Sequence, residues 1–260
     1  IGEWAACKFA HKTIAISQQI QRYADEAFDA KCAYIPYGVM DAVTIKSDKS
    51  IKERFGVESG KYALVVTRLI PHKGVHYLIA AWRGIKTDKK LVIAGEGHFT
   101  DSYVQYLRSL ARGDDRIVFT GFVAGDILHA LYTHASFVVQ PSEAEGLSIS
   151  LLEAMNYSKT IIASDIPENK EGLGDAGIYF SSGSTADLKR KLQMAIELPQ
   201  ENQEKLGQKA RARIENLHDW KLIALRTVDV YRGTDMFVEQ ANATLDSLET
   251  LDSLEATPLS

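Results

Sequence analysis

The 260-residue sequence predicts an α/β fold built around a doubly wound parallel sheet. Two observations support this fold class. From Tyr62 to Phe180, short apolar runs alternate with longer amphipathic ones, as in parallel sheets that helices cover on both faces. Loops rich in glycine, proline or charge follow the apolar runs. Such loops meet at the carboxyl edge of the sheet, where doubly wound folds bind their ligands.

Each apolar run has the length of a buried strand, and each amphipathic run is long enough for a helix. The predicted strands are Ala63–Thr67, Leu91–Ala94, Ile117–Thr120, Phe137–Gln140, Thr160–Ala163 and Ile178–Phe180. The predicted helices are Val75–Ile85, Ser102–Ala111, Asp126–His134, Ser148–Tyr157 and Thr185–Ile196. Right-handed crossovers between parallel strands turn this order into a doubly wound sheet.

The beginning of the chain departs from this alternation. Thr13–Ser17 and Ala33–Ile35 predict two strands that flank a helix at Gln18–Phe28, and residues 41–50 are polar and linker-like. The first residue is not methionine, and no signal-peptide pattern follows it. We therefore expect residues 1–40 to be the end of a preceding domain with its hinge, in a chain that has been cut.

After the expected sheet domain at residues 41–217, the chain changes character again. Glu201–Asn216 and Trp220–Arg232 have helical patterns, and residues 218–233 are expected to form a closing helix. Residues 234–260 are expected to be an acidic, disordered tail. The tail contains Thr-Leu-Asp-Ser-Leu-Glu twice, at 244–249 and 250–255, which is too few copies for a solenoid.

Composition excludes several classes of function. Hydrophobic residues make up 45% and charged residues 25% of the chain, values typical of a soluble globular protein. The formal net charge of −4 gives no basic field that would attract nucleic acid. No apolar run approaches the roughly 20 residues that span a bilayer. Cys7 and Cys32 are too few for a disulfide framework, which favours a reducing, cytoplasmic compartment.

The segment from Glu145 to Glu153 is the most informative part of the sequence. It places two carboxylates eight positions apart across an apolar stretch. A helix that opens at Gly146 or Leu147 would offer free backbone N–H groups to an anion. It would also hold the carboxylates roughly 12 Å apart along its axis. This spacing suits a ligand with hydroxyls at both ends and phosphate in the middle, such as a nucleotide-sugar.

A basic loop follows the first strand of the sheet. Arg68 and Lys73 flank it, and Gly74 opens the next helix. A guanidinium and an ammonium group together suit a diphosphate. The alternative interpretation is a pair of solvated surface cations.

Two glycine-containing turns follow the next strands. Gly95-Glu96-Gly97 lacks the third glycine of a dinucleotide fingerprint, so we expect a tight turn where the backbone approaches a ligand or another loop. Gly121-Phe122-Val123 could contact a nucleobase through its backbone, or it could be a turn with Phe122 in the core. The sequence contains no metal-ligand cluster, P-loop or G-x-S-x-G motif.

Taken together, these motifs resemble the donor-binding domain of retaining GT-B glycosyltransferases of family GT4. The resemblance covers most of residues 10–232. It rests on Arg68-Leu-x-x-x-Lys73-Gly, on Gly121-Phe, and on Pro141-Ser-x-x-Glu145-Gly-Leu-x-x-x-x-Leu-Glu153-Ala-Met. It implies a Rossmann-like sheet that forms one half of a GT-B enzyme. The enzyme would transfer a sugar from a UDP- or GDP-sugar to a saccharide or lipid-linked acceptor.

The resemblance also implies roles for individual residues. Arg68 and Lys73 would stabilise the leaving diphosphate, and Glu145 would contact hydroxyls of the transferred sugar. The implied donor-binding residues are Gly121, Phe122 and Val123 at the base, Gly146, Leu147 and Ser148 at the phosphates, and Glu153 at the ribose. Neither a covalent nucleophile, a metal nor a cofactor is expected.

Three segments of the chain differ from the family pattern. Leu147-Ser148 stands in place of Phe-Gly, Thr67 in place of glycine, and Asn156-Tyr157-Ser158 in place of a small, glycine-containing turn. None of these changes removes a charged group. The family's first domain, which binds the acceptor, is almost wholly missing. We therefore expect the 260 residues to bind a nucleotide-sugar without completing transfer, and the full-length protein to associate peripherally with a membrane.

Two other classes of function remain open from the sequence. One is a nucleotide-sugar-binding module without transferase activity. The other is an epimerase or hydrolase of the same architecture, for which the sequence shows no acid/base residues. The sequence does not reveal the base, the sugar or the acceptor, because base recognition through backbone atoms leaves no side-chain signature.

Overall fold

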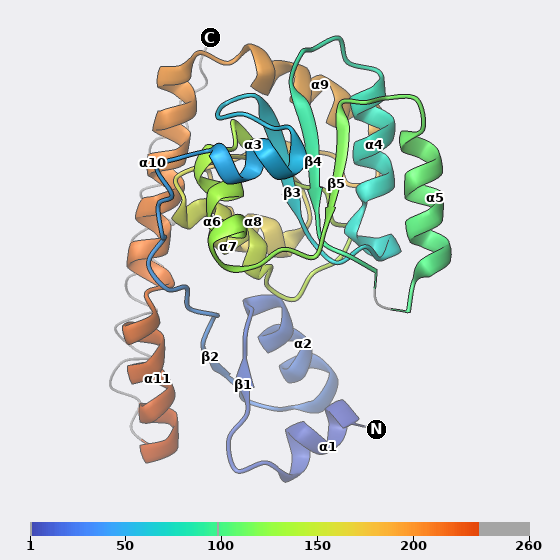
Figure 1. The fold of residues 1–260 in the computed structure, drawn as a ribbon. Helices are drawn as coiled ribbons and strands as arrows, with labels where there is room; N and C mark the ends of the chain where they lie inside the picture. The colour runs from blue at the N-terminus through green and yellow to red at the C-terminus, as the bar shows by residue number, and fades with distance from the viewer. Residues whose placement is uncertain (1, 98, 234–260) are drawn as a thin grey trace, which may run out of the picture.

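The computed structural model describes residues 2–97 and 99–233 of the chain. Its main body is a six-stranded sheet with helices on both sides (Figure 1). The acidic tail predicted at residues 234–260, with its repeated hexapeptide, lies outside the described residues.

The sheet is parallel throughout and has the strand order β5-β4-β3-β6-β7-β8. Its strands are β3 (Tyr62–Val66), β4 (Lys90–Ala94), β5 (Ile117–Gly121), β6 (Phe137–Gln140), β7 (Thr160–Ser164) and β8 (Ile178–Phe180). The doubly wound fold predicted from the sequence is confirmed, and each strand boundary lies within one residue of its predicted place. The order reverses between β3 and β6, so the loops after these two strands flank the crevice in which such sheets bind ligands.

The strands form because their side chains alternate between two apolar layers. In β3, Tyr62 and Leu64 join one core, while Ala63 and Val65 join the other. The first core packs against α6 (Gly125–His134), α7 (Ile149–Asn156), α8 (Pro167–Leu173) and α10 (Gln200–Leu217). The second core packs against α4 (Val75–Arg83), α5 (Asp101–Ala111) and α9 (Thr185–Glu197). Burial on both faces explains why the strands read as continuous apolar runs.

A small N-terminal unit lies at one end of the sheet domain (Figure 1). It consists of α1 (Gly2–Phe9), β1 (Ile14–Ala15), α2 (Gln18–Phe28) and β2 (Ala33–Tyr34), and β1 pairs in parallel with β2. The last described helix, α11 (Trp220–Arg232), runs beside this unit. Hydrogen bonds join this unit and the segment that follows it to the remainder. The Gln18 N–H at the start of α2 donates to Glu171 Oε1 of α8 at 2.8 Å, and the Val39 N–H donates to the His218 carbonyl at 2.9 Å.

The prediction of a polar, linker-like segment at residues 41–50 is wrong at its end. Helix α3 (Lys49–Phe55) begins inside it, with Ile51 fully buried, and Ile45 packs on the first core. Helices α1 and α8 were also missed by the sequence analysis. Each of these helices has only seven or eight residues, too few for helical periodicity to be read from the sequence. No helix among residues 2–97 and 99–233 is long and apolar enough to cross a membrane.

Candidate functional site

Two glycines bring the loops at the carboxyl edge of the sheet into contact. Gly74 has a φ of +67°, and a Cβ at this position would lie 1.9 Å from the Pro141 carbonyl oxygen. Gly95 has a φ of +136°, and its Cβ would lie 1.8 Å from the Thr67 oxygen. Only glycine fits such positions. The close backbone approach predicted at Gly95 is therefore confirmed, and the loop after β3 is held between those after β4 and β6.

A pocket of about 830 Å³ opens where these loops meet. Its lining includes every residue that the sequence analysis placed in the site except Gly121. The predicted residues present are Arg68, Lys73, Phe122, Val123, Glu145, Gly146, Leu147, Ser148 and Glu153. Further lining residues that were not predicted include Ile16 and Tyr37 of the N-terminal segment, with Glu96, Ile149 and Ser150 from the sheet domain.

The turn after β5 contributes Phe122 and Val123 to this pocket. Gly121 itself ends β5, and its carbonyl accepts a hydrogen bond from the Gly95 N–H at 3.0 Å. Gly121 therefore stabilises the loop that follows β4. Phe122 is 66% exposed, so the alternative that it packs in the core is wrong. An exposed aromatic ring at the edge of a pocket offers a face on which a planar ligand can stack.

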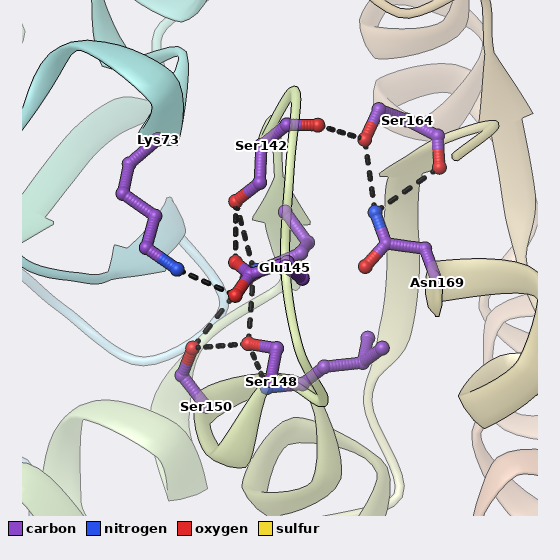
Figure 2. A network of polar contacts seen from close by, with 9 residues as sticks. Lys73, Ser142, Glu145, Ser148, Ser150, Ser164 and Asn169 are labelled. Atoms are coloured by element: carbon purple, nitrogen blue, oxygen red, sulfur yellow. Dashed lines mark hydrogen bonds and ion pairs between the residues drawn. The ribbon is translucent and has the colours of Figure 1, made fainter. Parts of the chain in front are cut away.

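Glu145 lies at the centre of a buried polar network (Figure 2). Lys73 Nζ donates to its Oε2 at 2.5 Å, and the two side chains are 12% and 6% exposed, respectively. Ser142 Oγ donates to Oε1 at 2.7 Å, and Gln140 Nε2 donates to the same oxygen at 2.8 Å. Because a carboxylate only accepts hydrogen bonds, these three donors fix the orientation of Glu145.

Arg68 and Lys73, the two cations predicted to bind a diphosphate together, differ in their burial and in their contacts. Lys73 is mostly buried in its ion pair with Glu145, so the interpretation of Lys73 as a solvated surface cation is wrong. Arg68 is exposed at the pocket. Within residues 2–97 and 99–233, its guanidinium has no hydrogen bond or ion pair. Arg68 is therefore free to bind an anion that enters the pocket.

The helix after Glu145 begins one residue after its predicted start at Ser148. Helix α7 starts at Ile149, with Ser148 as its N-cap, and the Leu151 N–H donates to Ser148 Oγ at 3.4 Å. A start at Gly146 or Leu147, on which the expected spacing of the two carboxylates depends, is not observed, because the Ser148 hydroxyl caps the helix. Glu145 therefore precedes the helix, and its separation from Glu153 cannot be derived from the helical rise.

The segment between the two carboxylates nevertheless offers donors. In the part of the chain that the structure describes, the backbone N–H groups of Gly146, Leu147 and Ser148 make no hydrogen bond. They lie in the pocket lining at the positive end of α7. Free N–H groups at a helix start favour phosphate binding.

Glu153 has a different environment on α7. Its Oε2 accepts a hydrogen bond from Tyr132 Oη at 3.0 Å. Burial raises the pKa of Glu153 above its usual value, while the Tyr132 hydrogen bond and nearby His129 act in the opposite direction. The Tyr132 ring stacks on Tyr157 at 5.2 Å, and Tyr157 Oη lies 2.6 Å from His129 Nδ1.

Sequence reasoning missed the residues that hold these two carboxylates. Gln140 could have been noticed, because it is a polar side chain at the end of an apolar strand. In the structure this side chain is only 2% exposed. Tyr132 carried no such signal, since it lies in the middle of an amphipathic helix. Among the described residues, no group of three or more His, Cys, Asp or Glu side chains could hold a metal ion.

Comparison with known proteins identifies the kind of protein to which this site belongs. Residues 47–213 match the family described as glycosyl transferases group 1. An uncharacterized glycosyltransferase of Methanocaldococcus jannaschii, MJ1069, is 31% identical over 232 residues, which is 82% of this chain and 56% of that protein. The alpha-D-kanosaminyltransferase of Streptomyces kanamyceticus is 26% identical over 216 residues, or 77% of this chain and 55% of that protein.

Solved structures show the same fold. Anabaena Alr3699/HepE in complex with UDP and glucose superposes with a TM-score of 0.80 at 24% identity, covering 88% of this chain and 65% of that one. Sucrose-phosphate synthase from Thermosynechococcus elongatus gives a TM-score of 0.78 at 22% identity, covering 89% and 60% of the two chains. These neighbours are GT-B glycosyltransferases, so the sheet domain corresponds to one half of that architecture.

The chain spans about half the length of the curated relatives that it matches. Relatives that carry a functional name are glycosyltransferases, and the alternative of a binding module without transferase activity is not favoured. The match to the family model extends over more than half of the chain and includes Arg68, Lys73, Glu145 and Glu153 of the pocket. The chain therefore belongs to the glycosyl transferases group 1 family.

Proposed function

We propose that this chain is the donor-binding half of a retaining glycosyltransferase of the GT4 type. Its donor would be a nucleoside diphosphate sugar, with UDP- and GDP-sugars as the first candidates. The acceptor would be a saccharide or a lipid-linked saccharide. One observation carries the proposal. A single pocket at the strand-order reversal contains a free guanidinium, three free backbone N–H groups and two differently held carboxylates.

The donor can be placed in this pocket by chemistry alone. The diphosphate would lie against Arg68 and the N–H groups of residues 146–148, where positive charge is concentrated. The sugar would lie at Glu145 and the ribose at Glu153, since hydroxyl groups donate to carboxylates. The base would then reach Phe122 and Val123, where an exposed aromatic ring is available.

The reaction breaks the bond between the anomeric carbon and the diphosphate oxygen, and the electron pair leaves with the diphosphate. Arg68, Lys73 and the free N–H groups would stabilise the charge that develops there. An acceptor hydroxyl would attack from the face on which the diphosphate departs, which retains the configuration. Its proton would pass to the departing oxygen, the nearest base on that face. The protein would contribute positioning and charge stabilisation, without a covalent nucleophile.

Acceptor binding would require residues beyond these 260, since the match covers only 52% and 55% of two of the curated relatives. We propose that the 260 residues bind the donor but do not transfer it. We also propose a cytoplasmic location, where the free thiols of Cys7 and Cys32 stay reduced. Appreciable glycosyl transfer to a defined acceptor by the isolated chain would contradict the first of these statements.

A thermal-shift screen tests the proposed donor directly. The chain is heated with UDP, GDP and ADP and with their common sugar conjugates. A ligand at 100 times its dissociation constant adds about 2.7 kcal/mol to the free energy of unfolding. One nucleotide series should raise the melting temperature while the others do not. The proposal fails if no nucleoside diphosphate or nucleotide-sugar raises it.

A further inference from the structure

The carboxylate of Glu145 has almost no free hydrogen-bonding capacity. An ionised carboxylate offers about four acceptor sites, two on each oxygen. Both sites on Oε1 are filled, by Ser142 Oγ at 2.7 Å and by Gln140 Nε2 at 2.8 Å. One site on Oε2 is filled by Lys73 Nζ at 2.5 Å. A single acceptor site is left, on Oε2 and next to the ammonium group of Lys73.

Gln140 is locked in the orientation that closes Oε1. Its Nε2 also donates to Ser148 Oγ at 2.9 Å, and its Oε1 accepts from Ser150 Oγ at 3.5 Å. Ser148 Oγ lies 3.1 Å from Ser150 Oγ and accepts from the Leu151 N–H. Since both acceptor sites of Ser148 Oγ are taken, Ser148 is the donor and Ser150 the acceptor in this pair. Turning the amide of Gln140 around would point its oxygen at the carboxylate, which has no proton to donate.

The backbone carbonyl of Ser142 is held by Ser164 (Figure 2). The Ser164 hydroxyl donates to the Ser142 carbonyl oxygen. Asn169 Nδ2 in turn donates to Ser164 Oγ at 2.9 Å and to its carbonyl oxygen at 3.1 Å. All three side chains are buried. These buried hydrogen bonds therefore hold the backbone of Ser142, whose hydroxyl fills the second site on Oε1.

We propose that Gln140 and Ser142 are positioning residues that determine sugar specificity, because they leave Glu145 able to accept one sugar hydroxyl, at Oε2 beside Lys73. This inference rests on the proposed function of the pocket. Neither Gln140 nor Ser142 lines the pocket, so both act through Glu145. Their loss should change how the sugar is recognised and leave the nucleoside diphosphate unaffected.

The test measures the gain in affinity that the sugar contributes. Isothermal titration gives the dissociation constant of the matching nucleoside diphosphate and of its sugar conjugate for the wild-type chain and for Gln140→Leu. In the variant, the diphosphate should bind within about twofold of wild type. The ratio of the two dissociation constants should fall about tenfold, or to one where the wild-type ratio is smaller, because a hydrogen bond to a charged group loses its geometry.

Monodeoxy analogues of the donor sugar test the claim of a single hydroxyl. The wild-type chain should lose affinity when one particular hydroxyl is removed and should tolerate removal of the others at this carboxylate. Gln140→Leu should remove most of that penalty, which is a double-mutant cycle between a residue and a ligand group. Ser142→Ala should act in the same direction with a smaller effect, and it provides the test should Gln140→Leu fail to fold.

Gln105→Leu provides a matched control, since Gln105 is exposed on α5, away from the pocket. It should leave both dissociation constants unchanged. The inference is overturned if Gln140→Leu and Ser142→Ala keep the sugar's contribution, or if they weaken diphosphate and conjugate equally. If the wild-type chain binds a nucleoside diphosphate but binds its sugar conjugate no more tightly, this inference is overturned while the proposed function stands. If the wild-type chain binds no nucleoside diphosphate, the proposed function itself fails.

Discussion

Glu145 and Glu153 lie eight residues apart and line the same pocket, yet their surroundings have little in common. Glu145 precedes α7 and is held by an ammonium group, a hydroxyl and an amide. Glu153 lies within α7 and receives one phenolic hydrogen bond from Tyr132. The same side chain is thus held by an ion pair in one place and, in the other, by a single hydrogen bond at a site where burial raises its pKa.

The difference indicates how the two carboxylates divide the recognition of a donor. The charge of Glu145 is balanced by Lys73, so its orientation is the property that the protein controls. The charge of Glu153 has no ion pair among the described residues, and burial raises its pKa. Its protonation state is therefore the property that responds to conditions. Environment sets the role of a carboxylate more than its position in a motif does.

The largest effect should come from Glu145→Ala. This substitution removes the proposed sugar contact and leaves the mostly buried ammonium group of Lys73 without its partner. In the full-length protein, the transfer rate should fall by about 10²–10³-fold, as for loss of a preorganised charge-stabilising group. Glu143→Ala is the matched control, because Glu143 is exposed in the same loop. If both substitutions change the rate equally, the network around Glu145 has no special role.

The next largest effect should come from Arg68→Ala. Arg68 is the free cation of the pocket, and a charge-assisted hydrogen bond is worth about 1.5–3 kcal/mol. Affinity for the nucleoside diphosphate should therefore fall by tenfold or more, as measured by isothermal titration, and the loss should shrink at high salt. Arg112→Ala, which removes an exposed guanidinium after α5, should leave the affinity unchanged.

A smaller effect is expected for Tyr132→Phe at the second carboxylate. The substitution removes the hydrogen bond to Glu153 and leaves the stacking on Tyr157 in place. The free energy of unfolding, measured with urea, should fall by about 1 kcal/mol. Affinity should fall for the nucleoside diphosphate but not for its 2′,3′-dideoxy analogue. Equal losses for both ligands would show that Glu153 does not contact the ribose.

The smallest effect is a pH dependence of stability that belongs to Glu153. Its pKa is raised in the folded state, so the folded protein holds this proton more tightly than the unfolded chain. The contribution of Glu153 to stability is therefore full at pH values below its usual pKa. It is lost as the pH rises through the raised value. Glu153→Gln should be at least as stable as wild type at neutral pH, with the difference shifting against the variant in acid. Urea unfolding at both pH values measures this, and a variant less stable only at neutral pH would contradict it.

Much of the fold followed from the sequence because the sheet is buried on both faces. Residues 62–66 and 137–140 could be read as strands from their aliphatic runs, without any knowledge of their neighbours. Helix α3 could not be read in this way, since a seven-residue helix with Ile51 as its buried anchor has no measurable period. The start of α7 was predicted to within one residue, but the spacing of the two carboxylates was derived for a start at Gly146 or Leu147, without the capping hydroxyl of Ser148.

The candidate site could be predicted in its charges but not in its contacts. Arg68, Lys73, Glu145 and Glu153 were recognisable because loops after parallel strands meet at one edge. Their partners depend on which side chains face each other across the sheet. Gln140 approaches Glu145 because β6 ends beside the loop that it opens. Tyr132 approaches Glu153 because α6 packs next to α7 on the same face.

The most direct test of the account is a crystal structure of this chain with the nucleotide-sugar selected by thermal shift. The account predicts that the ribose hydroxyls lie within hydrogen-bond distance of Glu153. The diphosphate should lie on Arg68 and the N–H groups of residues 146–148, and one sugar hydroxyl should lie on Glu145 Oε2. A ligand that binds with its sugar at Glu153, or that binds outside this pocket, would contradict the account.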